Sequence, residues 1–487
     1  MNSISEITKK ASIAFEQYAF TTALQRANFL ETIASNIEAL GDTLLEQAHK
    51  ETNLPLVRLQ GERARTCFQL RMFATMLKEG HYVEASIDTA IASKTPPKPD
   101  IRKMLHPIGP VVVFGASNFP FAYSTAGGDT ASALAVGCPV IVKAHPAHLA
   151  TSTLVAEAIV QAAETTKMPK DIFQHITLTS FEIGKALVQD ENVYAVGFTG
   201  SRNGGRALLD YASARKNPIP VFAEMGSVNP VILLQEALEK NAQNIAKNYA
   251  GSITLGMGQF CTNPGILVGV KSEALTNFSN ILATEMNAFA ASAMLHPGIE
   301  ESYLKNAAHA LAQKGVQCLT SKKPSANNNC AVLTTVDAAT FLSNPDLAEE
   351  VFGPYSILIQ CENVEELKKV WKNLKGQIST TIMGTDKDID AATDLLNMSL
   401  SIAGRIVING VPTGVEVCDS MVHGGPYPAS TDSRFTAVGV QAAKRWLRPI
   451  SFQNWPVHLL PAALQNHNPL GIWRNINGAL SKNEINA

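Results

Sequence analysis

Between residues 110 and 220, short apolar runs rich in β-branched residues alternate with stretches of helical periodicity. The apolar runs cover residues 110–114, 139–142, 173–178 and 193–198, and the helical stretches cover 122–136, 149–164, 183–188 and a segment from 203. Strands that are apolar at nearly every position are buried on both faces, which is typical of a parallel sheet covered by helices. The sequence therefore predicts an α/β fold.

A second series of the same kind follows. Its expected strands are 230–234, 266–270, 355–360, 380–384 and 405–409, with helical patterns between them. At 487 residues the chain is too long for one hydrophobic core, so two or three domains are expected. The first fifty residues predict a helical hairpin, because their apolar positions recur at three- and four-residue steps. The proline-containing link at 95–99 cannot be helical and is interpreted as an arm used in assembly.

The composition excludes several classes of function. With 40 Lys and Arg against 42 Asp and Glu, the chain has no electrostatic basis for binding nucleic acid or an anionic membrane. Charged residues make up 17% and hydrophobic residues 46%, which fits a globular protein with subunit interfaces. The seven cysteines are scattered without a C-x-x-C pair, which argues against disulfides and a zinc site. We expect a cytoplasmic protein, since neither a signal segment nor a run of about 18 apolar residues occurs.

One cysteine stands in a loop of small, turn-forming residues at 258–265. A thiol placed this way, that of Cys261, can be reached by a substrate, whereas a cysteine in an apolar run is usually a small buried hydrophobe. Upstream, Glu224 sets a carboxylate at the end of an apolar strand, where a general base can activate water. A nucleophilic thiol and a general base together predict a two-step covalent mechanism.

Three loops that follow strands of the first series predict an anion site. They cover 115–120, 143–146 and 198–201. Each opens a helix whose N-terminal amides can hold an anion, and ligands bind at the carboxyl ends of such strands. The G-x-G-x-x-G fingerprint of dinucleotide-binding proteins is absent. The spacing of the loops alone therefore favours a nucleotide site and a purely structural role equally. Ordinary structure would make Asn118 a turn or helix cap, Lys143 a solvated strand end and Phe352 a core aromatic.

Six short motifs occur in the same order as in a known enzyme family. They are SNFP at 117–120, VK at 142–143, FTGS at 198–201, EMG at 224–226 with NP at 229–230, GQFC at 258–261 and EEVFGP at 349–354. On these motifs the chain resembles the NAD(P)-dependent aldehyde dehydrogenase superfamily over about residues 100–440. Segments 421–430 and 62–71 resemble a narrower branch that contains α-ketoglutaric semialdehyde (2,5-dioxopentanoate) dehydrogenases and an NADP-linked fatty aldehyde dehydrogenase.

The resemblance implies an aldehyde dehydrogenase-like fold in three parts. A Rossmann-like cofactor domain is expected over residues 1–228, with an oligomerisation arm near 95–107. A second α/β domain that carries the nucleophile is expected over 229–412. Residues 413–487 are expected to return to the cofactor domain and to a subunit interface. A homodimer or homotetramer is implied, with no metal.

The resemblance also assigns the chemistry. Cys261 would add to the aldehyde carbon, and the oxyanion that forms would be held by the amide of Asn118 and the backbone N–H of Cys261. Glu224 would activate the water that hydrolyses the thioester. Members that transfer the acyl group to coenzyme A generally lack this glutamate, so Glu224 favours release of an acid. His423 is expected near the site, either with a direct part in catalysis or as a packing or substrate contact.

For the cofactor, the resemblance implies contacts from six residues, which are Lys143, Pro146, Gly200, Ser201, Glu350 and Phe352. NAD-preferring members often carry a glutamate at the position of Pro146, and its absence leaves room for the 2′-phosphate of NADP. No arginine stands at 179–185, where NADP-linked relatives can place one. The choice between NADP and NAD stays open, and the nearby cations Lys143 and Lys185 favour NADP.

Two kinds of aldehyde substrate fit the sequence. A semialdehyde with a far carboxylate needs a cation, which Arg65 or Arg71 can supply unless these arginines form ordinary ion pairs. A long-chain aldehyde needs an apolar tunnel instead. The candidates for such a tunnel are Phe68, Phe119 and Phe121. We expect α-ketoglutaric semialdehyde as the substrate. A broad-specificity or fatty aldehyde dehydrogenase is the alternative, and a non-catalytic protein of the same fold is the second alternative.

Overall fold

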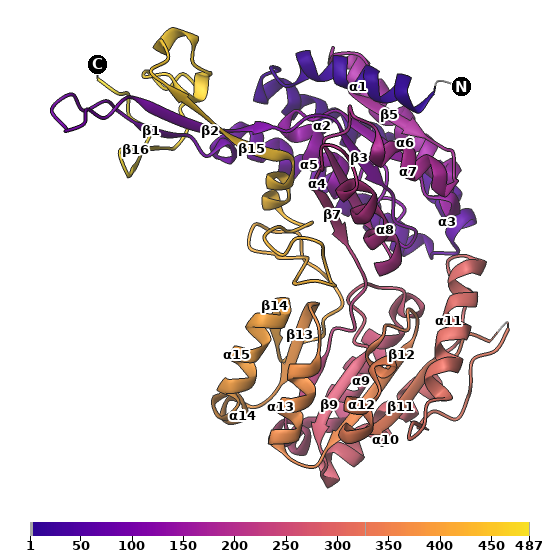
Figure 1. The fold of residues 1–487 in the computed structure, drawn as a ribbon. Coiled ribbons are helices and arrows are strands. Elements are labelled where there is room, and N and C mark those ends of the chain that lie inside the picture. Colours follow the sequence, from indigo (N-terminus) through magenta and orange to yellow (C-terminus); the bar gives the residue numbers. More distant parts are fainter. Residues whose placement is uncertain (1–2, 327, 487) are drawn as a thin grey trace.

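The computed structural model describes residues 3–326 and 328–486 and places its strands in three β-sheets (Figure 1). The first sheet is parallel, with the strand order β5–β4–β3–β6–β7. Its strands are β3 (Val111–Phe114), β4 (Val140–Lys143), β5 (Phe173–Ile176), β6 (Ala195–Thr199) and β7 (Val221–Glu224). The continuous apolar runs of the sequence are these strands, so the predicted parallel sheet is confirmed.

Helices cover the first sheet. They are α1 (Ile4–Tyr18), α2 (Ala23–Ala39), α3 (Gly41–Thr52), α4 (Leu56–Glu79), α5 (Gly128–Val136), α6 (Leu149–Thr165), α7 (Phe181–Gln189) and α8 (Arg202–Ser213). Apolar side chains of α2, α4, α5 and α6 form one buried core with β3 and β4, in which Phe29, Phe73 and Val113 are almost fully buried. The N-terminal hairpin of the sequence is therefore part of the cover of this sheet.

The helix expected at 122–136 begins later than its periodicity predicts. Residues 119–127 form a chain of turns, and α5 begins only at Gly128. The side chain of Glu62 on α4 accepts hydrogen bonds from the backbone N–H groups of Phe121 and Ala122, at 2.8 and 3.0 Å. Gly127 passes so close to the Ala122 carbonyl that no Cβ would fit. A tertiary contact and a tight glycine turn thus override the helical pattern.

The second sheet has seven strands in the order β10–β11–β12–β9–β8–β13–β14 and is parallel except for β10. The strands are β8 (Val231–Leu233), β9 (Ile266–Val270), β10 (Gln317–Cys318), β11 (Val332–Asp337), β12 (Tyr355–Cys361), β13 (Gln377–Met383) and β14 (Ala403–Ile408). The helices are α9 (Gln235–Thr254), α10 (Glu273–Ala288), α11 (Pro297–Leu311), α12 (Ala338–Ser343), α13 (Val364–Asn373), α14 (Asp386–Ala391) and α15 (Thr393–Ile402). The second α/β series is confirmed. The chain passes between the two sheets from Glu224 to Val231, an interval that contains the proposed boundary after residue 228.

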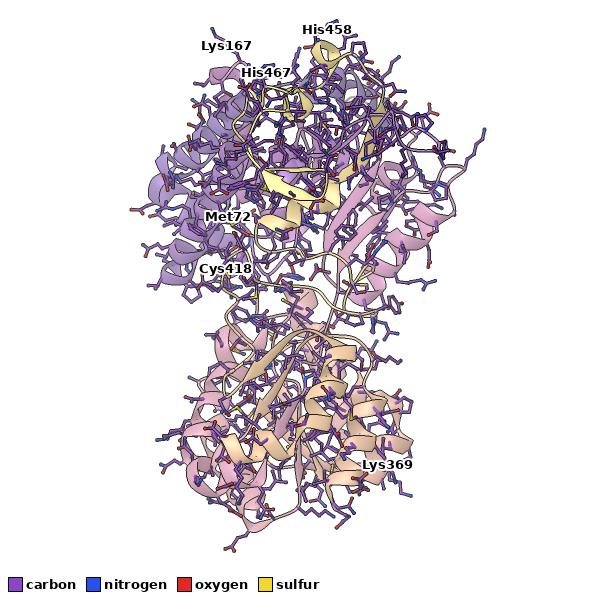
Figure 2. The ribbon with its side chains drawn as sticks, turned by 90° about the vertical axis from the view of Figure 1, so that its left-hand side faces the viewer. Met72, Lys167, Lys369, Cys418, His458 and His467 are labelled. Atoms are coloured by element: carbon purple, nitrogen blue, oxygen red, sulfur yellow. The ribbon has the colours of Figure 1, made fainter. Side chains whose placement is uncertain are left out.

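The third sheet projects from the rest of the molecule and combines early and late segments of the chain (Figure 1, left). Its strands are β1 (Ser86–Asp88), β2 (Ile101–Pro107), β15 (Leu447–Gln453), β16 (Arg474–Ile476) and β17 (Ala479–Ser481). β15 pairs antiparallel with β2 along its whole length. Figure 2 shows the yellow C-terminal segment passing Cys418 at the waist between the two α/β parts and rising to His458 and His467. None of the helices in the described ranges is long and apolar enough to cross a membrane.

Candidate active site

The loop that carries Cys261 follows α9 and is shaped by left-handed backbone. Gly256, Met257 and Gly258 have φ values of 54°, 60° and 62°. At Gly258 a Cβ would collide with the backbone carbonyl of Gly353, so only glycine fits there. Asn229 holds the far side of the loop, because its side-chain Nδ2 donates to the carbonyl oxygens of Cys261 and Asn263 at 2.8 and 3.0 Å. These contacts fix the backbone of the loop around Cys261, and the Cys261 side chain is only partly buried.

His423 links the thiol to the carboxylate of Glu224. Its Nε2 lies 3.5 Å from Cys261 Sγ, and its Nδ1 lies 2.9 Å from Glu224 Oε2. Only 2% of His423 and 7% of Glu224 are exposed, so the contacts are shielded from water. Burial by itself lowers the pKa of His423, but the neighbouring Tyr123, Cys261 and Glu224 favour the charged ring and raise the pKa well above its usual value. The arrangement can hold an imidazolium between a thiolate and a carboxylate.

Asn118 lies beside the thiol loop at the end of β3. Its side-chain Nδ2 donates to the carbonyl of Gln259 at 3.1 Å, two residues before Cys261. An amide nitrogen has two hydrogens, so a second donor remains for an oxyanion. The backbone carbonyl of Asn118 accepts from Nη2 of Arg58 at 2.7 Å, and the Arg58 guanidinium packs on the ring of Phe119. Arg58 thus fixes the turn that presents the amide.

A cavity of about 610 Å³ joins these groups. The predicted site residues in its wall are Asn118, Phe119, Gly200, Ser201, Glu224, Cys261, Glu350, Phe352 and His423. The wall also contains Tyr123, which no motif of the sequence indicated, with its ring centroid 5.9 Å from that of His423. Lys143 is the last residue of β4 and is half-buried, and Pro146 follows the strand and is exposed. Burial lowers the pKa of Lys143.

The cavity wall also carries groups that could hold a cofactor. Ser201 caps α8, because its side chain accepts from the N–H of Gly204 at 3.2 Å, and Ser201 itself lies in the cavity wall. The N-terminal amides of a helix can hold an anion. At Gly226 a Cβ would strike the carboxylate of Glu350, so the glycine leaves a cradle for that side chain. Burial raises the pKa of Glu350 to about 7, although a hydrogen bond from the Ser227 backbone lowers it in part. Such a carboxyl group is suited to accept from ribose hydroxyls.

The expectation that Arg71 reaches the substrate is wrong. Its guanidinium binds the carboxylate of Glu38 in a bidentate pair at 2.6 and 2.7 Å, and 43% of its side chain is exposed. Six residues separate Arg71 from Arg65, which is about one and two-thirds helical turns, so the two side chains leave α4 in different directions. Arg65 does lie near the cavity, with its guanidinium 5.9 Å from the ring centroid of Tyr123.

Of the three phenylalanines that could line an apolar tunnel for a long-chain aldehyde, one lies at the cavity. Phe119 lines the cavity, with its ring centroid 5.5 Å from that of Phe260. Phe68 is 51% exposed, and Phe121 is buried in the core. Within the described ranges, no cluster of three or more His, Cys, Asp or Glu side chains could hold a metal ion.

The chain matches known proteins over most of its length. The model of the Aldehyde dehydrogenase family matches residues 2–435. The chain is 47% identical to "Alpha-ketoglutaric semialdehyde dehydrogenase 2" of Azospirillum brasilense over 465 residues, which are 95% of this chain and 88% of that protein. It is 45% identical to "Alpha-ketoglutaric semialdehyde dehydrogenase" of Acinetobacter baylyi over 487 residues, 99% of this chain and 92% of that one.

Solved structures of low sequence identity share the fold. Aldehyde dehydrogenase 21 of Physcomitrella patens superposes with a TM-score of 0.78 at 19% identity, covering 94% of this chain and 91% of that chain. An apo betaine aldehyde dehydrogenase of Staphylococcus aureus gives a TM-score of 0.77 at 18% identity, covering 94% and 89% of the two chains. The α/β fold predicted from the sequence is thus confirmed.

Proposed function

This chain belongs to the aldehyde dehydrogenase family, and we propose that within the family it oxidises α-ketoglutaric semialdehyde to 2-oxoglutarate. The observation that carries the substrate is the identity of 45–47% to two proteins of that name across nearly the whole chain. The contact series from Cys261 through His423 to Glu224, beside the cavity, supplies the chemistry.

His423 prepares the thiol for attack. It takes the proton of Cys261 on Nε2 and donates its Nδ1 hydrogen to Glu224, so that an imidazolium stabilises the thiolate. The raised pKa of His423 favours this charged form. The Cys261 sulfur then forms a bond to the aldehyde carbon, and the carbonyl π electrons move to oxygen.

Asn118 stabilises the oxyanion of the resulting hemithioacetal with its free amide hydrogen. NAD(P)⁺, when bound, supplies the acceptor for the hydride that leaves the carbon. Glu350 and Ser201 are the residues that would hold it, from the cradle over Gly226 and the first turn of α8. The loss of the hydrogen leaves the acyl group on Cys261 as a thioester.

Glu224 completes the cycle. Its carboxylate lies in the cavity wall with Cys261, and it removes a proton from the water that attacks the thioester. The carbon–sulfur bond breaks, the thiolate of Cys261 leaves, and the acid is released. His423 holds the carboxylate in place through the 2.9 Å hydrogen bond.

For the cofactor we propose NADP over NAD. Pro146 provides no carboxylate to repel a 2′-phosphate, and Lys143 is a cation at the same strand end. An arginine between residues 179 and 185 would strengthen the preference for NADP, but this segment contains Phe181 and Glu182 instead.

We also propose that the protein is a cytoplasmic homodimer or homotetramer. Its seven cysteines are all free, which fits a reducing compartment. The projecting sheet exposes large apolar side chains, among them Trp455, Leu459, Trp473 and Leu480, which suit a subunit interface.

A panel of aldehydes tests the substrate and the cofactor together. We expect kcat/KM for α-ketoglutaric semialdehyde to exceed that for hexanal and decanal by at least about tenfold, and to be higher with NADP than with NAD. A preference for decanal would support a fatty aldehyde dehydrogenase instead. The absence of NAD(P)H formation with every aldehyde would support a non-catalytic protein of this fold.

A further inference from the structure

Tyr123 has a phenol hydroxyl that none of the proposed reaction steps uses. Its side chain is half-buried in the wall of the cavity, together with Cys261, Glu224 and His423. Within residues 3–326 and 328–486, this hydroxyl has no hydrogen-bond partner. Tyrosine hydroxyls withdrawn from water usually have a partner, so a free one in a cavity wall indicates a place where a ligand or water binds.

The turns between residues 119 and 127 fix the backbone of Tyr123. Its carbonyl accepts from the N–H of Ala116 at 2.9 Å, and its own N–H donates to the carbonyl of Phe119 at 3.4 Å. Glu62 holds the two residues before it through their backbone N–H groups. The break in the expected helix therefore ties Tyr123 to the turn that presents Asn118.

The ring of Tyr123 is packed between other side chains. Its centroid lies 5.4 Å from that of Phe119, edge to face, and 5.9 Å from that of His423. The guanidinium of Arg65 lies over the ring at 5.9 Å. Nε2 of His423 lies 3.5 Å from Cys261 Sγ, so Tyr123 is one ring away from the nucleophile.

The hydroxyl of Tyr123 is a donor at neutral pH. Burial raises the pKa of Tyr123, and the nearby Cys261 and Glu224 raise it further, while His423 and Arg65 oppose the shift. An ordinary tyrosine already has a pKa of about 10, so the phenol keeps its proton. It can therefore offer its hydrogen to an acceptor oxygen.

Of the oxygens of the proposed substrate, the 2-oxo oxygen suits this donor best. The aldehyde oxygen already has the amide of Asn118, which lies beside the thiol loop. A carboxylate is ionised and forms its stronger hydrogen bonds with charged donors. The 2-oxo oxygen is neutral, and its carbon is three bonds from the aldehyde carbon. This separation matches a donor that stands one ring away from the sulfur of Cys261.

We propose that the Tyr123 hydroxyl donates a hydrogen bond to the 2-oxo oxygen of the substrate and thereby selects aldehydes that carry this group. The contact rests on the proposed function and identifies the part of the substrate that is recognised beside the nucleophile. A site that spends a buried hydroxyl on one substrate oxygen discriminates against an analogue without that oxygen, because the hydroxyl is then left unpaired.

Glutaric semialdehyde provides the test, because it differs from α-ketoglutaric semialdehyde only in lacking the 2-oxo group. In Tyr123→Phe, kcat/KM for α-ketoglutaric semialdehyde falls about 5- to 50-fold, which is the loss typical of a removed hydrogen bond. With glutaric semialdehyde it stays within about twofold. Tyr194→Phe removes the hydroxyl of an exposed tyrosine outside the cavity wall and changes neither value.

A second measurement does not depend on turnover. In the Cys261→Ala background, calorimetry compares binding of 2-oxoglutarate and glutarate, and Tyr123→Phe weakens only the first, by a similar factor. Phenylalanine keeps the ring against His423, so iodoacetamide alkylates Cys261 in Tyr123→Phe at the wild-type rate. Slower alkylation together with equal losses on both semialdehydes overturns the contact, because Tyr123 would then act through His423.

The wild-type preference separates the contact from the proposed substrate. If another aldehyde with an oxo group is oxidised faster than α-ketoglutaric semialdehyde and Tyr123→Phe slows it selectively, the contact stands and the proposed substrate falls. If α-ketoglutaric semialdehyde is preferred and Tyr123→Phe keeps the full preference over glutaric semialdehyde, the contact falls and the substrate stands. A wild-type preference for glutaric semialdehyde overturns both.

Discussion

His423 is the side chain through which the nucleophile and the carboxylate meet. Its two ring nitrogens face Cys261 and Glu224, and its surroundings favour the charged ring. An imidazolium beside a sulfur atom stabilises the thiolate, and the thiolate is the reactive form of cysteine.

Replacement of His423 by Gln therefore slows alkylation of Cys261. At pH 7 we expect iodoacetamide to react with Cys261 at least about tenfold more slowly in His423→Gln than in the wild type, because less thiolate is present. Mass spectrometry of the labelled peptides measures the rate. Cys418 is exposed in the same chain and serves as the internal control. Equal alkylation rates of Cys261 in the two proteins would show that His423 does not stabilise the thiolate and serves only in packing.

Glu350 predicts a pH-dependent affinity for NAD. Because burial raises its pKa to about 7, the carboxyl group is mostly protonated at pH 6 and mostly ionised at pH 8. The ionised group is the stronger acceptor for hydroxyl donors, so binding tightens as the pH rises, by about three- to tenfold. Fluorescence titration with NAD measures the dissociation constant. In Glu350→Gln the same titration gives one value across this range, and an unchanged wild-type value would exclude Glu350 from the contact.

Cys261 and Glu224 could be identified from their sequence surroundings, because a loop thiol and a strand-end carboxylate have local signals. Arg71 was assigned wrongly, because the sequence of a helix does not show which of its faces is turned towards a distant cavity. Tyr123 was missed for a related reason. Its ring lies beside that of His423 in a segment of turns, where the periodicity had predicted a helix.

At the scale of the elements, the loop between α9 and β9 depends on glycine. Gly258 combines a φ of 62° with a close approach to the Gly353 carbonyl, next to Phe352 in the cavity wall. The sequence shows these glycines but not that the segment around Gly353 packs against them. The loop could therefore be predicted, and its shape could not. The late start of α5 has the same cause, because the contact from Glu62 comes from another helix.

Gly258→Ala tests this dependence. We expect it to destabilise the fold by about 1–3 kcal/mol through strain and to lower kcat strongly, because the thiol moves relative to Asn118. Gly251→Ala is the control, since it lies within α9 with open space around it. That change stabilises the helix by about 0.5–1 kcal/mol and leaves kcat unchanged. Thermal melts and initial rates give both quantities, and equal effects of the two substitutions would refute the argument.

At the scale of the whole molecule, two α/β parts bring complementary groups to one cavity. Glu224 ends β7 and Asn118 follows β3 in the first sheet, Cys261 precedes β9 of the second, and His423 lies on the segment that leads to β15 of the third. The two series of strands could be predicted from apolar periodicity. The pairing of β15 and β16 in the third sheet could not be predicted in this way, because these strands pair with β2 and β1, which lie more than 300 positions earlier in the chain.

The projecting sheet predicts assembly. β17 is an edge strand, and its Leu480 is 75% exposed. We expect Leu480→Asp to shift the sedimentation profile towards smaller species, since a buried carboxylate at the interface is unfavourable. Leu400→Asp changes an equally apolar, 68% exposed position on α15 and leaves the profile as in the wild type. Identical profiles for all three proteins would place the interface elsewhere.

Oxidation of the aldehyde to a thioester on Cys261 and hydrolysis of that thioester by water that Glu224 activates are separate steps of one reaction. Rapid mixing of Glu224→Gln with α-ketoglutaric semialdehyde and NADP, followed by acid quench and peptide mass spectrometry, measures both. We expect a burst of close to one NADPH per active site, slow turnover afterwards, and an acyl adduct on the peptide that contains Cys261. The absence of a burst, or an adduct on another cysteine, would contradict it.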